Sequence, residues 1–273
     1  MAESARSRPV PPGALAGRTI VVTRPERQAG ALADLIREAG GTPVVFPVLE
    51  IRDVDDPGPL AALVGRLAQF DLAVFISPNA VQKAMSSISA RGGFPPGLLA
   101  ATVGKGSAAE LRRHGVAGVI APSERFDSEA LLELPQMQAV AGKRIVIFRG
   151  QGGRELLGDT LAARGATVEY AECYRRAKPD ADPTPLLELW ARDALSGIAI
   201  TSSEGVRNLF EMVGPAGRGW LAQTLLFVPH ERIAETARSL GSTRLVLTGP
   251  NDEGVVAGMI DWWSVGHAPR TPA

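Results

Sequence analysis

The feature that most constrains the fold of this chain is an internal repeat with an offset of 125 residues. The segment 142–174, GKRIVIFRGQGGRELLGDTLAARGATVEYAECY, aligns without a gap on 17–49, GRTIVVTRPERQAGALADLIREAGGTPVVFPVL (142 − 17 = 125). Identical residues occupy the pairs Gly17/Gly142, Ile20/Ile145, Val21/Val146, Arg24/Arg149, Leu32/Leu157, Asp34/Asp159, Gly40/Gly165, Thr42/Thr167 and, further on, Ser77/Ser202 and Val81/Val206. A period of this length is the size of a domain, whereas solenoid repeats span only tens of residues. The sequence therefore predicts two similar domains.

Within each copy, short apolar strands alternate with amphipathic helices. Residues 20–22 form a β-branched run, after which Leu32, Leu35 and Ile36 recur at helical spacing. Further apolar runs lie at 72–76, 100–103, 145–148, 198–200, 225–228 and 245–247. Alternation of this kind is typical of parallel sheets built from right-handed βαβ crossovers. We therefore predict an α/β fold with two similar parallel-sheet lobes of the flavodoxin or Rossmann type.

The charge balance and the rare residues exclude several classes of function. Lys plus Arg and Asp plus Glu number 29 each, so no overall field attracts nucleic acid or an anionic membrane. The single cysteine, Cys173, excludes an intramolecular disulfide and fits a reducing compartment. Three scattered histidines predict no metal site, and no apolar run has the length of a signal peptide or a membrane span. We expect a cytoplasmic monomer that binds a small molecule and uses no cofactor.

Hydroxyls, glycines and cations gather in the loops that follow the predicted strands. These loops are Thr23-Arg24, Ser77-Pro78-Asn79, Gly104-Lys105-Gly106-Ser107, Arg149-Gly150-Gln151-Gly152-Gly153-Arg154, Thr201-Ser202-Ser203 and Thr248-Gly249. Ligands of open parallel sheets bind at the carboxyl ends of strands, where helix N-termini present unpaired amides. Such residues suit a carboxylate or phosphate. Two sheets whose loop ends face each other would form a cleft lined by anion-binding helix termini.

The alternative for any one loop is a structural role. Serines at these positions commonly cap helices, and glycines commonly permit tight turns. The glycines at 150–153 match neither the Rossmann spacing nor a P-loop, which disfavours nucleotide chemistry. The G-x-S-x-G elbow of a serine hydrolase is also absent.

Several segments, in order, resemble the uroporphyrinogen-III synthase family. They are IVVTRPERQAGALADLIREAGGTPVVFPVLEI, FDLAVFISPNAV, ATVGKGSAAELRRHGV, RFDSEAL, GKRIVIFRGQGGRELLGDTLAARGATVEYAECYRR and IAITSSEGVRNL. The resemblance spans residues 17–262 and implies two α/β lobes joined by a two-stranded ladder. Residues 17–49 plus 175–263 would form the first lobe and 52–172 the second, with 44–51 and 168–176 as the ladder. Residues 1–16 would be a disordered leader and 264–273 a tail.

The family implies an activity and a set of site residues. Its members close a linear tetrapyrrole polycarboxylate, hydroxymethylbilane, with loss of the hydroxyl and inversion of the last pyrrole. Tyr174 matches the functionally implicated tyrosine of the family, and a phenol can protonate a departing hydroxyl. The alternative is that Tyr174 only packs against the ladder. The substrate-binding residues that we expect are Arg24, Ser77, Asn79, Lys105, Ser107, Arg149, Gly150, Ser202 and Ser203.

Two other classes of function stay open at this stage. The loop 228–232 (VPHER) departs from the family, in which many members have a glycine and small hydroxyl residues. A two-lobed tetrapyrrole-binding or regulatory module without catalysis is therefore the alternative to the enzyme. A DNA-binding regulator is disfavoured because the chain lacks a basic stripe.

Overall fold

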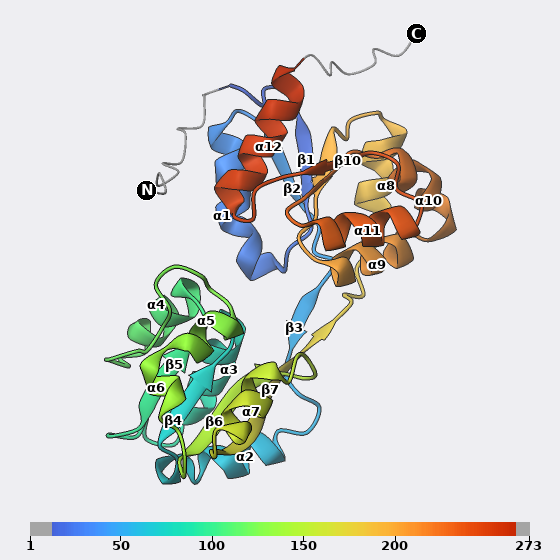
Figure 1. The fold of residues 1–273 in the computed structure, drawn as a ribbon. Coiled ribbons are helices and arrows are strands. Elements are labelled where there is room, and N and C mark those ends of the chain that lie inside the picture. The colour runs from blue at the N-terminus through green and yellow to red at the C-terminus, as the bar shows by residue number, and fades with distance from the viewer. Residues whose placement is uncertain (1–12, 266–273) are drawn as a thin grey trace, which may run out of the picture. The chain divides into compact units, whose positions relative to one another are not determined.

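The computed structural model describes residues 13–265, which divide into two compact units (Figure 1). Unit 1 comprises the residues up to Glu50 and those from Ala177 onward, and unit 2 comprises Ile51–Arg176. Of the predicted leader, residues 1–12 lie outside the described chain, as do 266–273 of the predicted tail. The prediction was wrong for residues 13–16, because Leu15 is fully buried in the core and its amide donates to the Ala39 carbonyl at 2.8 Å.

Unit 1 is a five-stranded sheet with helices on both faces. Its strand order is β10-β9-β8-β1-β2, and all its printed pairings are parallel. The strands are β1 (Thr19–Val22), β2 (Thr42–Val45), β8 (Gly197–Ala199), β9 (Leu226–Val228) and β10 (Leu245–Leu247). One face packs on α1 (Glu26–Glu38) and α12 (Asp252–Ser264), and the other on α8 (Thr184–Ala191), α9 (Ser203–Met212), α10 (Gly214–Gln223) and α11 (Glu231–Ser239). The sheet therefore has one apolar core on each of its two faces.

Unit 2 has the same two-faced construction. Its strand order is β3-β7-β6-β4-β5, and β6 pairs in parallel with both β4 and β7. The strands are β3 (Glu50–Arg52), β4 (Leu72–Phe75), β5 (Leu99–Thr102), β6 (Arg144–Gly150) and β7 (Thr167–Ala177). The helices are α2 (Gly58–Val64), the short 3-10 turn Leu67–Gln69, α3 (Pro78–Ser89), α4 (Lys105–Arg113), α5 (Ser128–Glu133), α6 (Pro135–Gln138) and α7 (Leu156–Ala163). The prediction of α/β units with parallel sheets is thus confirmed.

The sequence repeat reappears as a repeated spatial order of strands. The offset of 125 residues carries β1 and β2 onto β6 and β7, and it carries β4 and β5 onto β8 and β9. Sheet 1 therefore contains the order β9-β8-β1-β2 and sheet 2 the equivalent order β5-β4-β6-β7. The counterpart of β10 in unit 2 is a single parallel bridge between Ile120 and Ala101 of β5, and β3 is an edge strand of unit 2 without a named counterpart in unit 1. Equivalent loops of the two units can accordingly be compared residue by residue.

The predicted ladder segments lie largely inside the two sheets. Val44 and Val45 belong to β2 and pair with β1, and residues from Val168 to Glu172 pair with β6. The expected extents 44–51 and 168–176 were therefore too long, because the first residues of both segments are paired inside the sheets. The chain passes from one unit to the other at Glu50–Ile51, in β3, and at Arg176–Ala177, in β7.

Within unit 2, Glu169 on β7 joins two arginines. Its carboxylate accepts two hydrogen bonds from Arg66, at 2.8 and 2.5 Å, and lies 3.6 Å from Arg144. The hydrogen bonds from Arg66 lower the pKa of Glu169, against the opposing effect of burial. A lowered folded-state pKa means that the pair stabilises the protein above the ordinary pKa of 4.5 and loses this contribution as the pH falls through the lowered value.

We therefore expect Glu169→Gln to reduce the acid sensitivity of unfolding. The free energy of unfolding of the wild type should fall more steeply below about pH 4.5 than that of the variant. Urea titrations at a series of pH values measure this difference. Glu133→Gln, which removes a highly exposed pair with Arg125, is the matched control and should leave the pH dependence unchanged, because surface ion pairs contribute little. Parallel curves for the wild type and Glu169→Gln would contradict the assignment.

No helix among residues 13–265 has both the length and the apolar character needed to cross a membrane.

Candidate active site

The carboxyl ends of β4 and β6 in unit 2 form the point where the strand order reverses. From β4 the chain passes to β5 on one side, and it then returns to β6 on the other side. Two adjacent loops that turn away from each other leave a crevice at the carboxyl edge of an open parallel sheet. Here these loops are the one after Phe75, which opens α3, and the one after Gly150, which leads to α7. Candidate side chains from both loops lie at this edge.

Tyr174 and Ser77 are brought into contact there, although they are distant in sequence. The Tyr174 hydroxyl lies 3.1 Å from Ser77 Oγ. The Tyr174 side chain is 2% exposed and belongs to the apolar core that includes Phe75 and Phe148, whereas Ser77 is partly exposed. Ser77 also caps α3, since its Oγ accepts from the Ala80 amide at 3.1 Å, and Pro78 follows at the first helical position. The core thus fixes the ring, and the helix cap fixes the hydroxyl that it meets.

Gly150 leaves the space that the Tyr174 ring occupies. A Cβ atom at Gly150 would lie 2.6 Å from Cε2 and 2.7 Å from Cζ of Tyr174. Buried ring atoms cannot yield to such an overlap as the end of an exposed side chain can. The glycine that we predicted as a substrate-binding residue is therefore required for the position of the phenol.

Arg149 is a buried cation beside this glycine. It is 5% exposed, and its Nε donates to the carbonyls of Gly152 at 3.0 Å and Gly150 at 3.3 Å. Its guanidinium lies over the Tyr170 ring, 4.7 Å from the centroid. Within residues 13–265 no carboxylate forms an ion pair with it, although buried charges in proteins are normally paired. Partial burial raises the pKa of the Tyr170 phenol, and the neighbouring Arg149 charge opposes that shift.

The neighbouring loop after β5 adds a cation and an exposed aromatic ring. Lys105, the first residue of α4, places its ammonium 4.8 Å from the centroid of the Phe126 ring, which is 43% exposed. Ser107 is buried in the first turn of α4, so its hydroxyl does not face solvent, and Asn79 lies partly exposed in the first turn of α3. Phe126 was not predicted as a site residue. The sequence feature that could have indicated Phe126 is an aromatic residue within the polar loop SERFDSE.

The helix that follows Phe126 is capped by Asp127, whose Oδ1 accepts from the Ala130 amide at 2.7 Å. The carboxylate of Asp127 is thereby committed to the helix N-terminus and is turned toward the protein backbone. Within residues 13–265 Lys105 forms no ion pair, and its ammonium lies against the Phe126 ring.

The equivalent edge of unit 1 holds Arg24, Ser202 and Ser203. Arg24 pairs with Asp252 of α12 at 2.6 Å, with both side chains about one-fifth exposed. Ser202 caps α9 by accepting from the Gly205 amide at 2.9 Å, and Ser203 Oγ donates to the Arg232 carbonyl at 3.3 Å. Each of these predicted ligands therefore already has a partner inside its own unit.

The two edges differ most at the position of Tyr174. With the offset of 125, Ser77 corresponds to Ser202 and Arg149 to Arg24, but Tyr174 corresponds to Leu49. Leu49 is buried and carries no hydroxyl. Of the two equivalent edges, only that of unit 2 combines a phenol with a capping serine. The two equivalent edges therefore differ in this pair of hydroxyl groups, although the fold is repeated.

Neither Cys173 nor any metal-binding cluster of residues 13–265 forms a second candidate site. Burial raises the pKa of the Cys173 thiol to about 12, so the thiol stays protonated and is a poor nucleophile. Among residues 13–265 no cluster of three or more His, Cys, Asp or Glu side chains could hold a metal ion.

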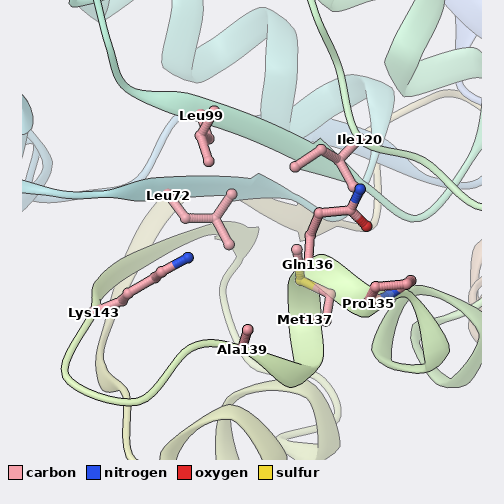
Figure 2. Close-up of a pocket in the computed structure, with 8 residues that line it drawn as sticks. All are labelled: Leu72, Leu99, Ile120, Pro135, Gln136, Met137, Ala139 and Lys143. Carbon is pink, nitrogen blue, oxygen red and sulfur yellow. The ribbon is translucent and has the colours of Figure 1, made fainter.

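A hollow of about 350 Å³ lies at the opposite end of the unit 2 sheet (Figure 2). Leu72 and Leu99, the first residues of β4 and β5, line it together with Ile120, Pro135, Gln136, Met137, Ala139 and Lys143. In Figure 2 the Lys143 ammonium is turned toward Leu72. The lining is mostly apolar and contains a single cation, which is a poor match for a ligand with many carboxylates.

The sequence is similar to known proteins over most of its length. The family model described as uroporphyrinogen-III synthase HemD matches residues 30–257. Uroporphyrinogen-III synthase of Escherichia coli (strain K12) is 36% identical over 226 residues, which cover 82% of this chain and 92% of that protein. The protein of the same name from Synechococcus elongatus is 32% identical, over 77% of this chain and 80% of that protein.

Solved structures share the fold at low sequence identity. The chain matches a mutant uroporphyrinogen III synthase from the extremely thermophilic bacterium Thermus thermophilus with a TM-score of 0.57 and 21% identity, over 91% of this chain and 99% of that one. It matches uroporphyrinogen-III synthetase from Helicobacter pylori 26695 with a TM-score of 0.55 and 14% identity, over 90% of this chain and 99% of that one.

Proposed function

The chain belongs to the uroporphyrinogen-III synthase family, and from this premise we propose a reaction centre at the carboxyl edge of unit 2. The protein is a cyclising lyase of tetrapyrrole biosynthesis. Its substrate in this proposal is hydroxymethylbilane, which loses its hydroxyl as water and is closed to uroporphyrinogen III with the last pyrrole inverted. The observation that carries the location is the contact of Tyr174 with Ser77, which the equivalent edge of unit 1 cannot form.

In this proposal Tyr174 is the source of the proton that the leaving hydroxyl takes up. A phenol retains its proton at neutral pH and can release it to an alcohol oxygen as the carbon–oxygen bond breaks. The buried ring supports this role because it cannot rotate away, so the hydroxyl is held in place before substrate binds. The proton returns when the new carbon–carbon bond forms and a pyrrole carbon loses its own proton.

Substrate carboxylates bind, in the same proposal, to the cations and helix N-termini of this edge. Arg149 supplies a guanidinium without an acid partner in the described chain, and Lys105 supplies an ammonium at the start of α4. No side chain caps α4, so the amides of its first turn add neutral donors. On unit 1 we propose Arg24, Ser202 and Ser203 as further ligands, which would exchange their partners within that unit for substrate carboxylates. Local groups of this kind can hold a polyanion although the net charge of the chain is zero.

The isomer of the product tests the proposed function. Purified protein supplied with enzymatically generated hydroxymethylbilane should form the type III isomer, separated from type I by chromatography. The type I isomer forms spontaneously, so reactions without protein give the background. A product that is only type I would refute the activity, and tetrapyrrole binding without turnover would identify a binding module instead.

Phe126 should contribute to substrate affinity through its exposed ring. Its partly exposed face lies beside the Lys105 ammonium, so a pyrrole can stack on the ring while a pyrrole carboxylate meets the cation. We expect Phe126→Leu to raise the KM roughly 3- to 10-fold, because ring contacts contribute about 0.5–1.5 kcal/mol beyond their buried area. The kcat should change little. Initial rates over a range of substrate concentrations measure both constants.

Trp220→Leu is the control for Phe126→Leu, since Trp220 is similarly exposed, at 44%, on α10 of unit 1. It should leave the KM unchanged. Equal KM values for Phe126→Leu and the wild type would remove the ring from the substrate site.

We further propose that β3 and β7 form the connection between the units, since the chain passes from one unit to the other in these two neighbouring strands. Residues 17–49 with 175–263 and residues 52–172 are the corresponding lobes. A cytoplasmic location is supported by the single, buried and unpaired cysteine.

A further inference from the structure

We propose that Ser77 is a catalytic residue that touches the leaving hydroxyl of the substrate and relays the Tyr174 proton to it. This inference deepens the proposed function and rests on it, because it takes Tyr174 as the source of the proton. The structural starting point is the 3.1 Å contact between the two hydroxyl groups at the carboxyl edge of unit 2.

Tyr174 is more deeply buried than Ser77, which is the order of burial that a proton relay to a bound substrate needs. Tyr174 is 2% exposed, with its ring among the apolar side chains of the core, whereas Ser77 is partly exposed on the loop before α3. A substrate that approaches the edge therefore meets Ser77 before it meets the phenol. The phenol reaches the edge only through its hydroxyl, which lies against Ser77 Oγ.

The hydrogen-bonding capacity of Ser77 also fits a relay. A serine hydroxyl has one donor hydrogen and two acceptor lone pairs. One lone pair accepts from the Ala80 amide at 3.1 Å. When the second accepts from the Tyr174 hydroxyl, the serine hydrogen remains for the substrate oxygen. Both lone pairs and the hydrogen of the Ser77 hydroxyl then have a defined partner.

The step balances in atoms and charge. The Ser77 O–H bond breaks as its hydrogen bonds to the hydroxyl oxygen of the substrate, while the Tyr174 proton moves to Ser77 Oγ. The carbon–oxygen bond of the substrate breaks with its electron pair on oxygen, so water leaves, and the substrate carbon becomes cationic. The phenolate that remains lies at the N-terminus of α3, whose partial positive charge stabilises it. After ring closure a pyrrole carbon releases a proton, which returns through Ser77 to Tyr174.

The test compares Ser77→Gly with Ser77→Thr in the full chain. Glycine is accepted at a helix N-cap at a cost of only a few tenths of a kcal/mol relative to serine, so α3 should persist without the hydroxyl. We expect Ser77→Gly to lower the kcat for type III formation roughly 100-fold with the KM within about 2-fold, at the low end for loss of a proton-transfer group. Ser77→Thr restores a hydroxyl and should retain most of the kcat.

Two further variants distinguish a proton-relay role of Ser77 from its role as the cap of α3. Ser77→Asn keeps a capping oxygen but has no hydroxyl, so it should be as slow as Ser77→Gly, and it replaces that variant if Ser77→Gly does not fold. Asp182→Gly removes a carboxylate that accepts from the Thr184 amide at 2.9 Å at the start of α8, and it should leave the kcat unchanged. A wild-type kcat in Ser77→Asn would overturn the relay, as would a Ser77→Thr variant as slow as Ser77→Gly.

The double variant Ser77→Gly/Tyr174→Phe tests whether the two hydroxyls act as one unit. Groups that act in one step are strongly non-additive. We expect the double variant to be no more than about 2-fold slower than the slower single variant. Rate losses that multiply would overturn the relay, and so would a slow Ser77→Gly beside an unaffected Tyr174→Phe. In each of these cases type III formation by the wild type leaves the proposed function intact, whereas only type I from the wild type refutes that function itself.

Discussion

Tyr174→Phe is expected to slow formation of the type III isomer about 100-fold, the lower end of the range for loss of a general acid. Phenylalanine fills the same buried space, and its ring packs against the same core residues, so the melting temperature should stay near that of the wild type. The KM should also change little, because the phenol is 2% exposed and offers almost no surface to a bound substrate. Steady-state rates and thermal unfolding of the same preparation measure both effects.

Tyr170→Phe is the matched control for this prediction. Tyr170 and Tyr174 lie on the same strand, and Tyr170→Phe keeps the ring under the Arg149 guanidinium. Its rate should stay within about 2-fold of the wild type, since the ring face interacts with the cation mainly through its π system. Equal rates for Tyr174→Phe and the wild type would exclude the phenol from the reaction.

Arg149→Met is expected to raise the KM roughly 10- to 100-fold without lowering the melting temperature. A charge-assisted hydrogen bond to a carboxylate contributes about 1.5–3 kcal/mol, which sets the size of the loss. Stability should be preserved because the lost hydrogen bonds from Nε to the Gly150 and Gly152 carbonyls are offset by removal of a buried cation without an acid partner in the described chain. Loss of affinity without loss of stability is the signature of a residue kept for its ligand.

The equivalent variant in unit 1, Arg24→Met, provides the contrast. Arg24 pairs with Asp252 at 2.6 Å, so its removal leaves a partly buried carboxylate without its partner and should lower the melting temperature. A fall in melting temperature for Arg149→Met as large as that for Arg24→Met, with an unchanged KM, would make Arg149 a structural residue.

Much of the fold was predictable because it depends on local pattern and on the repeat. Apolar runs such as 145–148 and the helical spacing of Leu32, Leu35 and Ile36 are properties of neighbouring residues. The repeat also shows, from the sequence alone, that the loop of Arg24 is equivalent to that of Arg149. The extents of the strands were less predictable, since pairing partners decide where β7 ends and the sequence does not name them.

The candidate site was predictable in its location but less so in its contacts. Loops after parallel strands meet at one edge, which follows from the α/β pattern alone. The contact of Ser77 with Tyr174 joins residues 97 positions apart, and the pair of Arg24 with Asp252 is longer still, so no local spacing signals either one. Phe126 was missed because exposure, which makes its ring available, is a property of the folded loop.

The interleaving of unit 1 has a consequence for synthesis on the ribosome. Strand β1 precedes unit 2 in the chain, but its neighbour β8, the central strand of the sheet, follows the whole of unit 2. Domains fold as units during translation, generally in the order in which they are completed. Unit 2 is thus completed first, and β1 and β2 remain without a full sheet until β8, β9 and β10 have been synthesised.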